Sequence, residues 1–117
     1  PVLDEQTLKD YLETLGAPAF KQSIELFEQL LPSYLNKMVE STVVHNLEEF
    51  QSSAHKLKGA AGSVGLHIIQ LRAKEFEKTE DPKWEFLEKQ LMDFHQEINR
   101  DVETLKVYVN KWAEVNH

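Results

Sequence analysis

Hydrophobic positions recur every three or four residues along almost the whole chain, which predicts helices throughout. No stretch shows the strict alternation of apolar and polar residues that is typical of β-strands. The 117 residues therefore predict an all-α protein. We expect an antiparallel four-helix bundle with an additional short N-terminal helix, because the helical segments are joined by short connections. A chain of this length suits one domain, so residues 1–117 are expected to form a single domain.

Capping residues and helix breakers place the boundaries in the first half of the chain. Asp4 is expected to cap a first helix that runs to about Leu15, where Gly16 provides a C-terminal signal. Pro18 suits the first turn of a second helix. Pro32 should kink or break that helix, because proline lacks an amide donor and its ring clashes with the preceding turn.

Three further helices are predicted in the second half of the chain. A polar corner at residues 45–46 leads into one helix, which ends at a turn over residues 63–65. The next helix spans roughly residues 66–78. Asp81 as a cap and Pro82 at the first helical position are expected to begin the last helix. Its apolar positions continue almost to the end of the chain: Trp84, Leu87, Leu91, Phe94, Ile98, Val102, Leu105, Tyr108 and Trp112.

The helix after the polar corner carries a histidine on the side opposite its apolar stripe. The stripe consists of Leu47, Phe50, Ala54, Leu57, Ala61 and Val64. At about 100° per residue, His55 projects roughly 140° from the centre of this stripe, and Gly59 and Gly62 fall on the same outward side. Glycine inside a helix costs about 0.5–1 kcal/mol relative to alanine, so outward glycines favour the close approach of another molecule. For Gly62, fraying before the turn at Gly65 is an equally good explanation.

Composition and charge narrow the classes of function. Thirteen basic and twenty acidic side chains give a net charge of -7, so most of the surface should repel nucleic acid and anionic membranes. No apolar run approaches the ~18 residues that cross a bilayer, and direct membrane insertion is not expected. The absence of cysteine excludes disulfides, thiolate metal sites and cysteine nucleophiles. It also fits a reducing compartment, and we expect a cytoplasmic location.

Four basic residues lie around the histidine and on the following segment: Lys56, Lys58, Arg72 and Lys74. Within an acidic protein, such a patch indicates an anionic ligand or an acidic pocket on a partner. The alternative is an ordinary solvated helix face.

His55 has the chemistry of a nucleophile. A neutral imidazole can attack with one ring nitrogen while an acceptor holds the other. Residues 55 and 77 are symmetric about Leu66, so an antiparallel hairpin centred there brings Glu77 to the height of His55. The Glu77 carboxylate could then fix the tautomer of the ring. Lys58, three residues after His55, could reach a phosphoryl oxygen.

Three short segments resemble the histidine-containing phosphotransfer (HPt) domain of multistep phosphorelays. They are Ala-His-Lys-Leu-Lys-Gly at 54–59, Val-Gly-Leu at 64–66 and Phe-Glu at 76–77. The family pattern is an Ala-His-x-Leu-Lys-Gly core, a Leu-Gly-like turn and a later Leu-Glu-like pair. Val64 and Phe76 stand where leucine is frequent, and both are apolar replacements. The resemblance covers nearly the whole chain.

The resemblance implies a phosphorelay signalling module. His55 would accept a phosphoryl group from the aspartyl-phosphate of a response-regulator receiver domain and transfer it to another receiver. Lys58 would assist the phosphoryl group, Glu77 would orient the histidine, and Gly59 would keep the approach open. Further contacts with the receiver are expected from Ser52, Lys56, Gly62, Arg72 and Lys74.

The same resemblance implies that the module works without a cofactor of its own, since Mg²⁺ would belong to the receiver. No glycine-rich phosphate loop follows a strand, so autonomous ATP-dependent kinase activity is not expected. The isolated domain is expected to be monomeric. It could be free-standing or the soluble C-terminal domain of an inner-membrane hybrid sensor kinase.

Two other classes of function stay open at this point. One is a non-catalytic helical interaction bundle in which the histidine is incidental. The other is an enzyme-like bundle with a carboxylate–histidine metal centre. No metal site is expected, because such centres need inward-facing ligands and His55 faces outward. The remaining histidines are expected to be ordinary surface or capping residues: His45, His67, His95 and His117.

Overall fold

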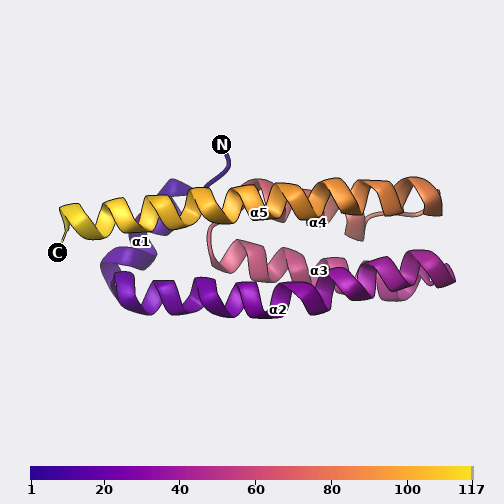
Figure 1. Ribbon diagram of the computed structural model, residues 1–117, viewed down its shortest axis with the longest axis horizontal. Helices are drawn as coiled ribbons and strands as arrows, with labels where there is room; N and C mark the ends of the chain where they lie inside the picture. Colours follow the sequence, from indigo (N-terminus) through magenta and orange to yellow (C-terminus); the bar gives the residue numbers. More distant parts are fainter. Residues whose placement is uncertain (117) are drawn as a thin grey trace.

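The computed structural model describes residues 1–116, and within them the chain forms five helices (Figure 1). Their bounds are Glu5–Leu15 (α1), Ala17–Val44 (α2), Leu47–Ser63 (α3), His67–Glu77 (α4) and Trp84–Val115 (α5). No strand occurs among these residues, and the only β-type pairing is an isolated antiparallel bridge between Leu3 and Leu66. The prediction of an all-α protein is confirmed.

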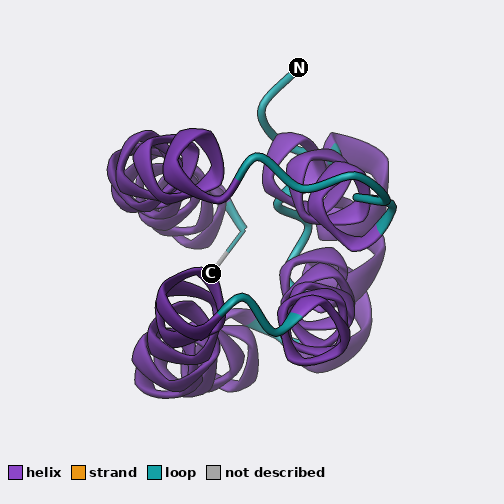
Figure 2. Ribbon diagram, turned by 90° about the vertical axis from the view of Figure 1, so that its right-hand side faces the viewer, coloured by secondary structure: helices purple, strands orange, loops and turns teal. Residues whose placement is uncertain are grey.

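Helices α2 to α5 occupy the four corners of an elongated bundle of 49 × 22 × 19 Å (Figure 2). The long helices α2 and α5 run along the whole molecule, whereas α3 and α4 form a shorter hairpin beside them (Figure 1). Helix α3 packs closely against both α2 and α4, while α4 touches α5 at few points. The predicted four-helix bundle with an additional N-terminal helix is therefore confirmed.

The short helix α1 covers the bundle where the α3–α4 hairpin ends. Its residues Leu8 and Leu12 are buried. The amide of Asp4 donates to the carbonyl of Gly65 at 3.0 Å, which ties the start of the chain to the hairpin turn. Gly65 has a φ of 75°, and a Cβ at this position would lie 2.7 Å from the Leu8 side chain. The turn therefore requires glycine both for its backbone conformation and for the packing of α1.

The first helix begins and ends as predicted, but α2 continues through Pro32. Asp4 caps α1 by accepting from the amide of Thr7, and the amide of Gly16 closes its C-terminal end. Helix α2 is unbroken from Ala17 to Val44, so of the kink or break predicted at Pro32 the break does not occur. Pro32 is exposed, and its missing donor removes one backbone hydrogen bond. Buried apolar residues on both sides hold the helix together across it: Phe27, Leu31, Leu35 and Met38.

The predicted start of α5 is also wrong. The helix begins at Trp84 with Lys83 as its N-cap, and neither Asp81 nor Pro82 belongs to it. The indole of Trp84 stacks on His45 with ring centroids 5.1 Å apart, and it meets the edge of Phe50 at 6.3 Å. These contacts with the α2–α3 corner anchor the first residue of the helix. His45 caps α2 in the left-handed conformation, so its predicted capping role is confirmed.

No helix among residues 1–116 combines the length and the apolar composition that crossing a membrane requires.

Candidate functional site

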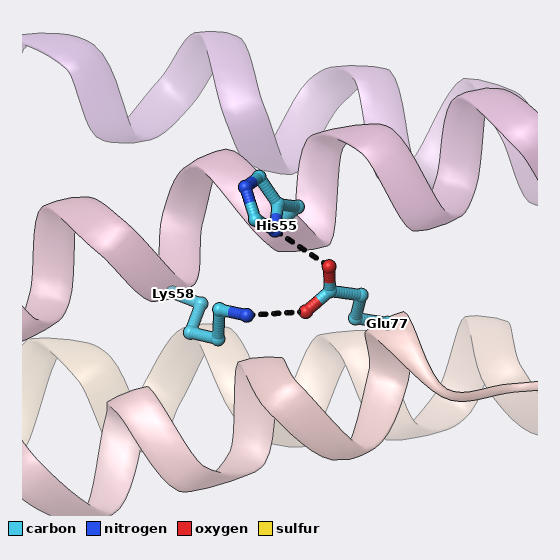
Figure 3. Close-up of polar contacts among 3 residues, drawn as sticks. All are labelled: His55, Lys58 and Glu77. Atoms are coloured by element: carbon cyan, nitrogen blue, oxygen red, sulfur yellow. Dashed lines mark hydrogen bonds and ion pairs between the residues drawn. The ribbon is translucent and has the colours of Figure 1, made fainter.

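The α3–α4 hairpin brings His55 and Glu77 into contact (Figure 3). The two residues are 22 positions apart in sequence, and Nδ1 of His55 lies 2.6 Å from Oε2 of Glu77. The side chain of His55 is 64% exposed and that of Glu77 is 26% exposed. The predicted hairpin register is thus confirmed, with the imidazole outside the bundle and the carboxylate at the edge of the helix–helix seam.

The contact with Glu77 distinguishes the two nitrogens of the imidazole. An ionised carboxylate only accepts hydrogen bonds, so Nδ1 of the neutral ring must carry the proton and donate it. In that tautomer Nε2 holds the lone pair. Among the described residues Nε2 has no hydrogen-bond partner, and the ring is largely exposed. The arrangement presents one nucleophilic nitrogen to solvent.

Lys58 binds the second oxygen of the same carboxylate. Its Nζ donates to Oε1 of Glu77 at 2.6 Å (Figure 3). The hydrogen bond from Lys58 is the largest cause that lowers the pKa of Glu77, and His55 lowers it further, whereas partial burial opposes them. Glu77 is therefore ionised at neutral pH. The expected position of Lys58 beside His55 is confirmed, but its ammonium group is engaged along the α3–α4 seam.

The two glycines of the α3 face differ in their surroundings. A Cβ at Gly59 would meet no atom within 4 Å, so this position faces open space as predicted. A Cβ at Gly62 would lie 2.6 Å from Nε2 of Gln70 on α4. The prediction that Gly62 faces outward is wrong, because α4 starts directly after the turn and covers this flank of α3.

The basic residues predicted around the histidine do not form one patch. Lys56 and Ser52 are exposed, and both line a shallow depression beside His55. Lys74 is exposed three residues before Glu77, on the same side of α4.

Arg72 lies elsewhere on the molecule. It is five residues before Glu77 and about 140° around the helix axis. Its Nε donates to Oε1 of Glu97 on α5 at 2.8 Å, and its Nη2 to Oε2 at 3.3 Å. The expectation that Arg72 belongs to the His55 surface is wrong, because a carboxylate on α5 pairs with it on the other side of α4.

A third polar contact of the seam was not predicted. Nε2 of Gln51 donates to the main-chain carbonyl of Thr79 at 2.6 Å. Gln51 lies one turn before His55 on the same side of α3, and it lines the depression together with His55 and Glu77. In the sequence, the spacing of four residues between Gln51 and His55 was the one sign that both lie on the same side of the helix.

The other histidines take no part in this site. His45 stacks on Trp84, His95 is exposed on α5, and His67 is half-buried at the start of α4 where exposure was expected. His117 lies outside the described residues. Glu114 and His117 form the one Glu-x-x-His motif of the sequence, a spacing that is typical of metal sites in helical bundles. Within residues 1–116, no group of three or more potential ligands is arranged to hold a metal ion.

Comparison with known proteins identifies the family. The sequence model of the Hpt domain matches residues 22–107. The aerobic respiration control sensor protein ArcB is similar over 111 residues, with 32% identity for the protein of Escherichia coli O157:H7 and 31% for that of Shigella flexneri. The match covers 94% of this chain but only 14% of those proteins.

Solved structures agree with the sequence comparison. The histidine-containing phosphotransfer domain of ArcB from Escherichia coli superposes with a TM-score of 0.84 at 31% identity, covering 94% of both chains. A solution structure of the same domain gives 0.83 and covers 94% of this chain and 89% of the other. The chain therefore belongs to the Hpt family, the histidine-containing phosphotransfer domains of two-component phosphorelays.

Proposed function

We propose that His55 is the residue that carries the phosphoryl group. It accepts the group on Nε2 from the aspartyl-phosphate of one receiver domain and passes it to the aspartate of another. The observation that carries this proposal is the difference between the two ring nitrogens. Nδ1 is bound to Glu77 at 2.6 Å, whereas among the described residues Nε2 has no such partner and belongs to an exposed side chain. Hpt domains interact with response-regulator receivers, so the partner class follows from the family.

The transfer needs no proton movement at the histidine. The Nε2 lone pair attacks phosphorus, a P–N bond forms, and the P–O bond to the receiver aspartate breaks with the electron pair leaving on its carboxylate. The proton stays on Nδ1, so the ring becomes cationic while it carries the phosphoryl group. The ionised Glu77 stabilises that positive charge from the opposite side of the ring. Return transfer to a second receiver follows the same path in reverse.

The neighbouring residues support approach and charge neutralisation. Gly59 leaves the side of α3 next to His55 open for a receiver. Lys58 is near enough to exchange a Glu77 oxygen for a phosphoryl oxygen, and Lys56 and Ser52 border the same depression. Gly62 and Arg72 contact other helices, so we leave them out of the receiver surface. Lys74 on the flank of Glu77 completes it.

The remaining features of the proposal follow from the family. The Mg²⁺ that assists transfer is bound by the receiver, and the domain itself acts as a monomer without a cofactor. It has no kinase activity of its own. By analogy with ArcB, it works in the cytoplasm, either free-standing or as a domain of a hybrid sensor kinase.

A transfer assay tests the proposal directly. The protein is mixed with Mg²⁺ and a receiver domain that carries a radiolabelled aspartyl-phosphate, and the label is followed over time. Wild type should acquire label that is labile in acid and stable in base, as a phosphoramidate is. His55→Gln should acquire none, whereas His95→Gln, at an exposed position on α5, should label like wild type. An unlabelled wild type, or equal labelling of His55→Gln, would refute the proposal and favour a non-catalytic interaction bundle.

A further inference from the structure

Gln51 makes a contact that no other side chain of the described chain makes. Its Nε2 donates to the carbonyl of Thr79 at 2.6 Å, across 28 residues of sequence. Within residues 1–116, every other side-chain hydrogen bond to the main chain joins residues that are at most four apart. Gln51 thus fastens the helix that carries His55 to the backbone beyond the end of α4.

The anchored carbonyl lies directly after the residue that holds the imidazole. Glu77 is the last residue of α4, and Thr79 is the second residue after it. The amide of Lys78 donates to the carbonyls of Lys74 and Glu75 at 3.2 Å, and the amide of Thr79 donates to that of Phe76 at 3.1 Å. The amide groups of this segment are therefore held by α4 itself, and the Thr79 carbonyl is held by Gln51.

Phe76 is buried against Phe50 and Phe94 and holds the last turn of α4 in the core, whereas the chain that follows Glu77 is mostly exposed. Helix α4 touches α5 at few points, and the connection over residues 78–83 is not helical. The last carbonyls of a helix have no partner within the helix, so helix ends fray when nothing outside binds them. Lys58 binds Oε1 of Glu77, but its long flexible side chain can follow a moving carboxylate. The Gln51 bond is the polar contact that fixes the backbone.

We propose that Gln51 is a positioning residue for phosphotransfer: it holds the end of α4 against α3 so that Glu77 keeps its hydrogen bond to Nδ1 of His55. This inference rests on the proposed role of His55. When the anchor is removed, the carboxylate spends less time on Nδ1. The neutral ring then shifts towards the tautomer that is protonated on Nε2, and that tautomer has no lone pair to offer to phosphorus.

The matched test uses Gln51→Met, which keeps the length of the side chain and removes the donor. Ring ¹⁵N shifts of His55, recorded where the imidazole is neutral, report the tautomer. Gln51→Met should shift the tautomer towards Nε2–H, and uptake of label from a phosphorylated receiver should slow by about tenfold, as is typical for loss of a group that orients a reactive one. Gln96→Met, at an exposed position on α5, should change neither quantity.

A second comparison tests whether Gln51 acts by positioning Glu77 or by stabilising the bundle in general. If Gln51 acts through Glu77, then adding Gln51→Met to Glu77→Ala should slow uptake no further than Glu77→Ala alone. If the two substitutions slow uptake multiplicatively, Gln51 acts by another route and the inference is wrong.

The outcomes for the two proposals are distinguishable. A wild type that takes up no label refutes the role of His55, while the tautomer shift still decides whether Gln51 orients the ring. A labelled wild type with an unchanged tautomer and rate in Gln51→Met overturns the inference about Gln51 alone. Gln51→Ala serves as the second variant, since it removes the donor without apolar bulk. If neither variant folds, the bond is required for the fold and the positioning role is overturned.

Discussion

The proposed reactivity of His55 rests on the two inequivalent nitrogens of its ring. Glu77 takes Nδ1, and its other oxygen is occupied by Lys58, so the carboxylate has a defined orientation. A carboxylate accepts hydrogen bonds and carries charge, so it selects one tautomer and also stabilises the cationic phosphorylated ring. An amide at this position could accept from Nδ1 or donate to it, so it would not select one tautomer, and it would carry no charge.

At the same scale, Gly59 should matter for transfer but not for folding. Gly59→Leu places a side chain where a Cβ meets no atom within 4 Å, so the bundle has room for it. Leucine is the better helix former, and the free energy of unfolding should rise by about 0.5–1 kcal/mol. Uptake of label from a phosphorylated receiver should fall by about tenfold or more, because the new side chain occupies the docking face. Thermal unfolding and the transfer assay measure the two effects, and unchanged transfer would rule out the clearance role.

The sequence predicted part of the site, for reasons that differ between residues. His55 and Glu77 could be paired because helical periodicity and the turn at residues 64–66 together fix the hairpin register. The partner of Lys58 could not be predicted, because the rotamers of a long side chain leave no periodic signal. The Gln70 side chain covers Gly62 because α4 lies beside this flank of α3, and the apolar pattern on α3 alone does not contain that information.

Among the helices, α2 shows how tertiary packing overrides a local signal. Its buried face continues on both sides of Pro32, so the burial of that face outweighs the loss of one hydrogen bond. The start of α5 was shifted in the same way by the stack of Trp84 on His45. The existence and type of the helices could be predicted from their apolar stripes, whereas these two boundaries depend on contacts between residues far apart in sequence.

Replacing the helix proline should therefore stabilise the protein. Pro32→Ala restores an amide that can donate to the carbonyl of Glu28, and Pro32 is exposed, so no packing is lost. We expect a gain of about 1–3 kcal/mol in the free energy of unfolding, because part of the helical gain is offset by the freer unfolded chain. Chemical denaturation measures the gain, with Ser33→Ala as the neighbouring control. A gain no larger than that of the control would contradict this account of α2.

On the scale of the whole molecule, Asp101 on α5 carries a buried oxygen without a hydrogen-bond partner within residues 1–116. It is 7% exposed, and among the described residues its Oδ2 is the buried side-chain oxygen or nitrogen without a hydrogen-bond partner. Burial raises the pKa of Asp101, and the neighbouring charge of Glu97 raises it further. A carboxyl whose pKa is higher in the folded state binds its proton more tightly there. The folded state is thus favoured below the unfolded pKa and loses this advantage as the pH rises through the folded pKa.

Asp101→Asn should accordingly stabilise the protein at neutral pH. The substitution removes a buried charge, and the expected gain in the free energy of unfolding is about 1 kcal/mol. The gain should shrink at acid pH, where Asp101 is protonated and already neutral. Thermal unfolding of both proteins across the acid range measures this difference, with Asp93→Asn, at an exposed position on the same helix, as the control. A gain that does not depend on pH would show that the charge is not its cause.

Within the part of the chain that the structure describes, only one nitrogen of His55 is free, which limits how many receivers can exchange a phosphoryl group with the domain at one time. In the proposed transfer, donor and acceptor receivers must both reach Nε2, so they would bind the same face one after the other and exclude one another. A receiver that dissociates slowly after transfer prevents the next receiver from binding. An excess of unphosphorylated receiver should therefore slow the phosphorylation of His55 as a competitive inhibitor would. The rate of phosphoryl transfer from one receiver to the other should then be greatest when both complexes dissociate quickly. Fast dissociation would therefore serve the phosphorelay better than tight binding.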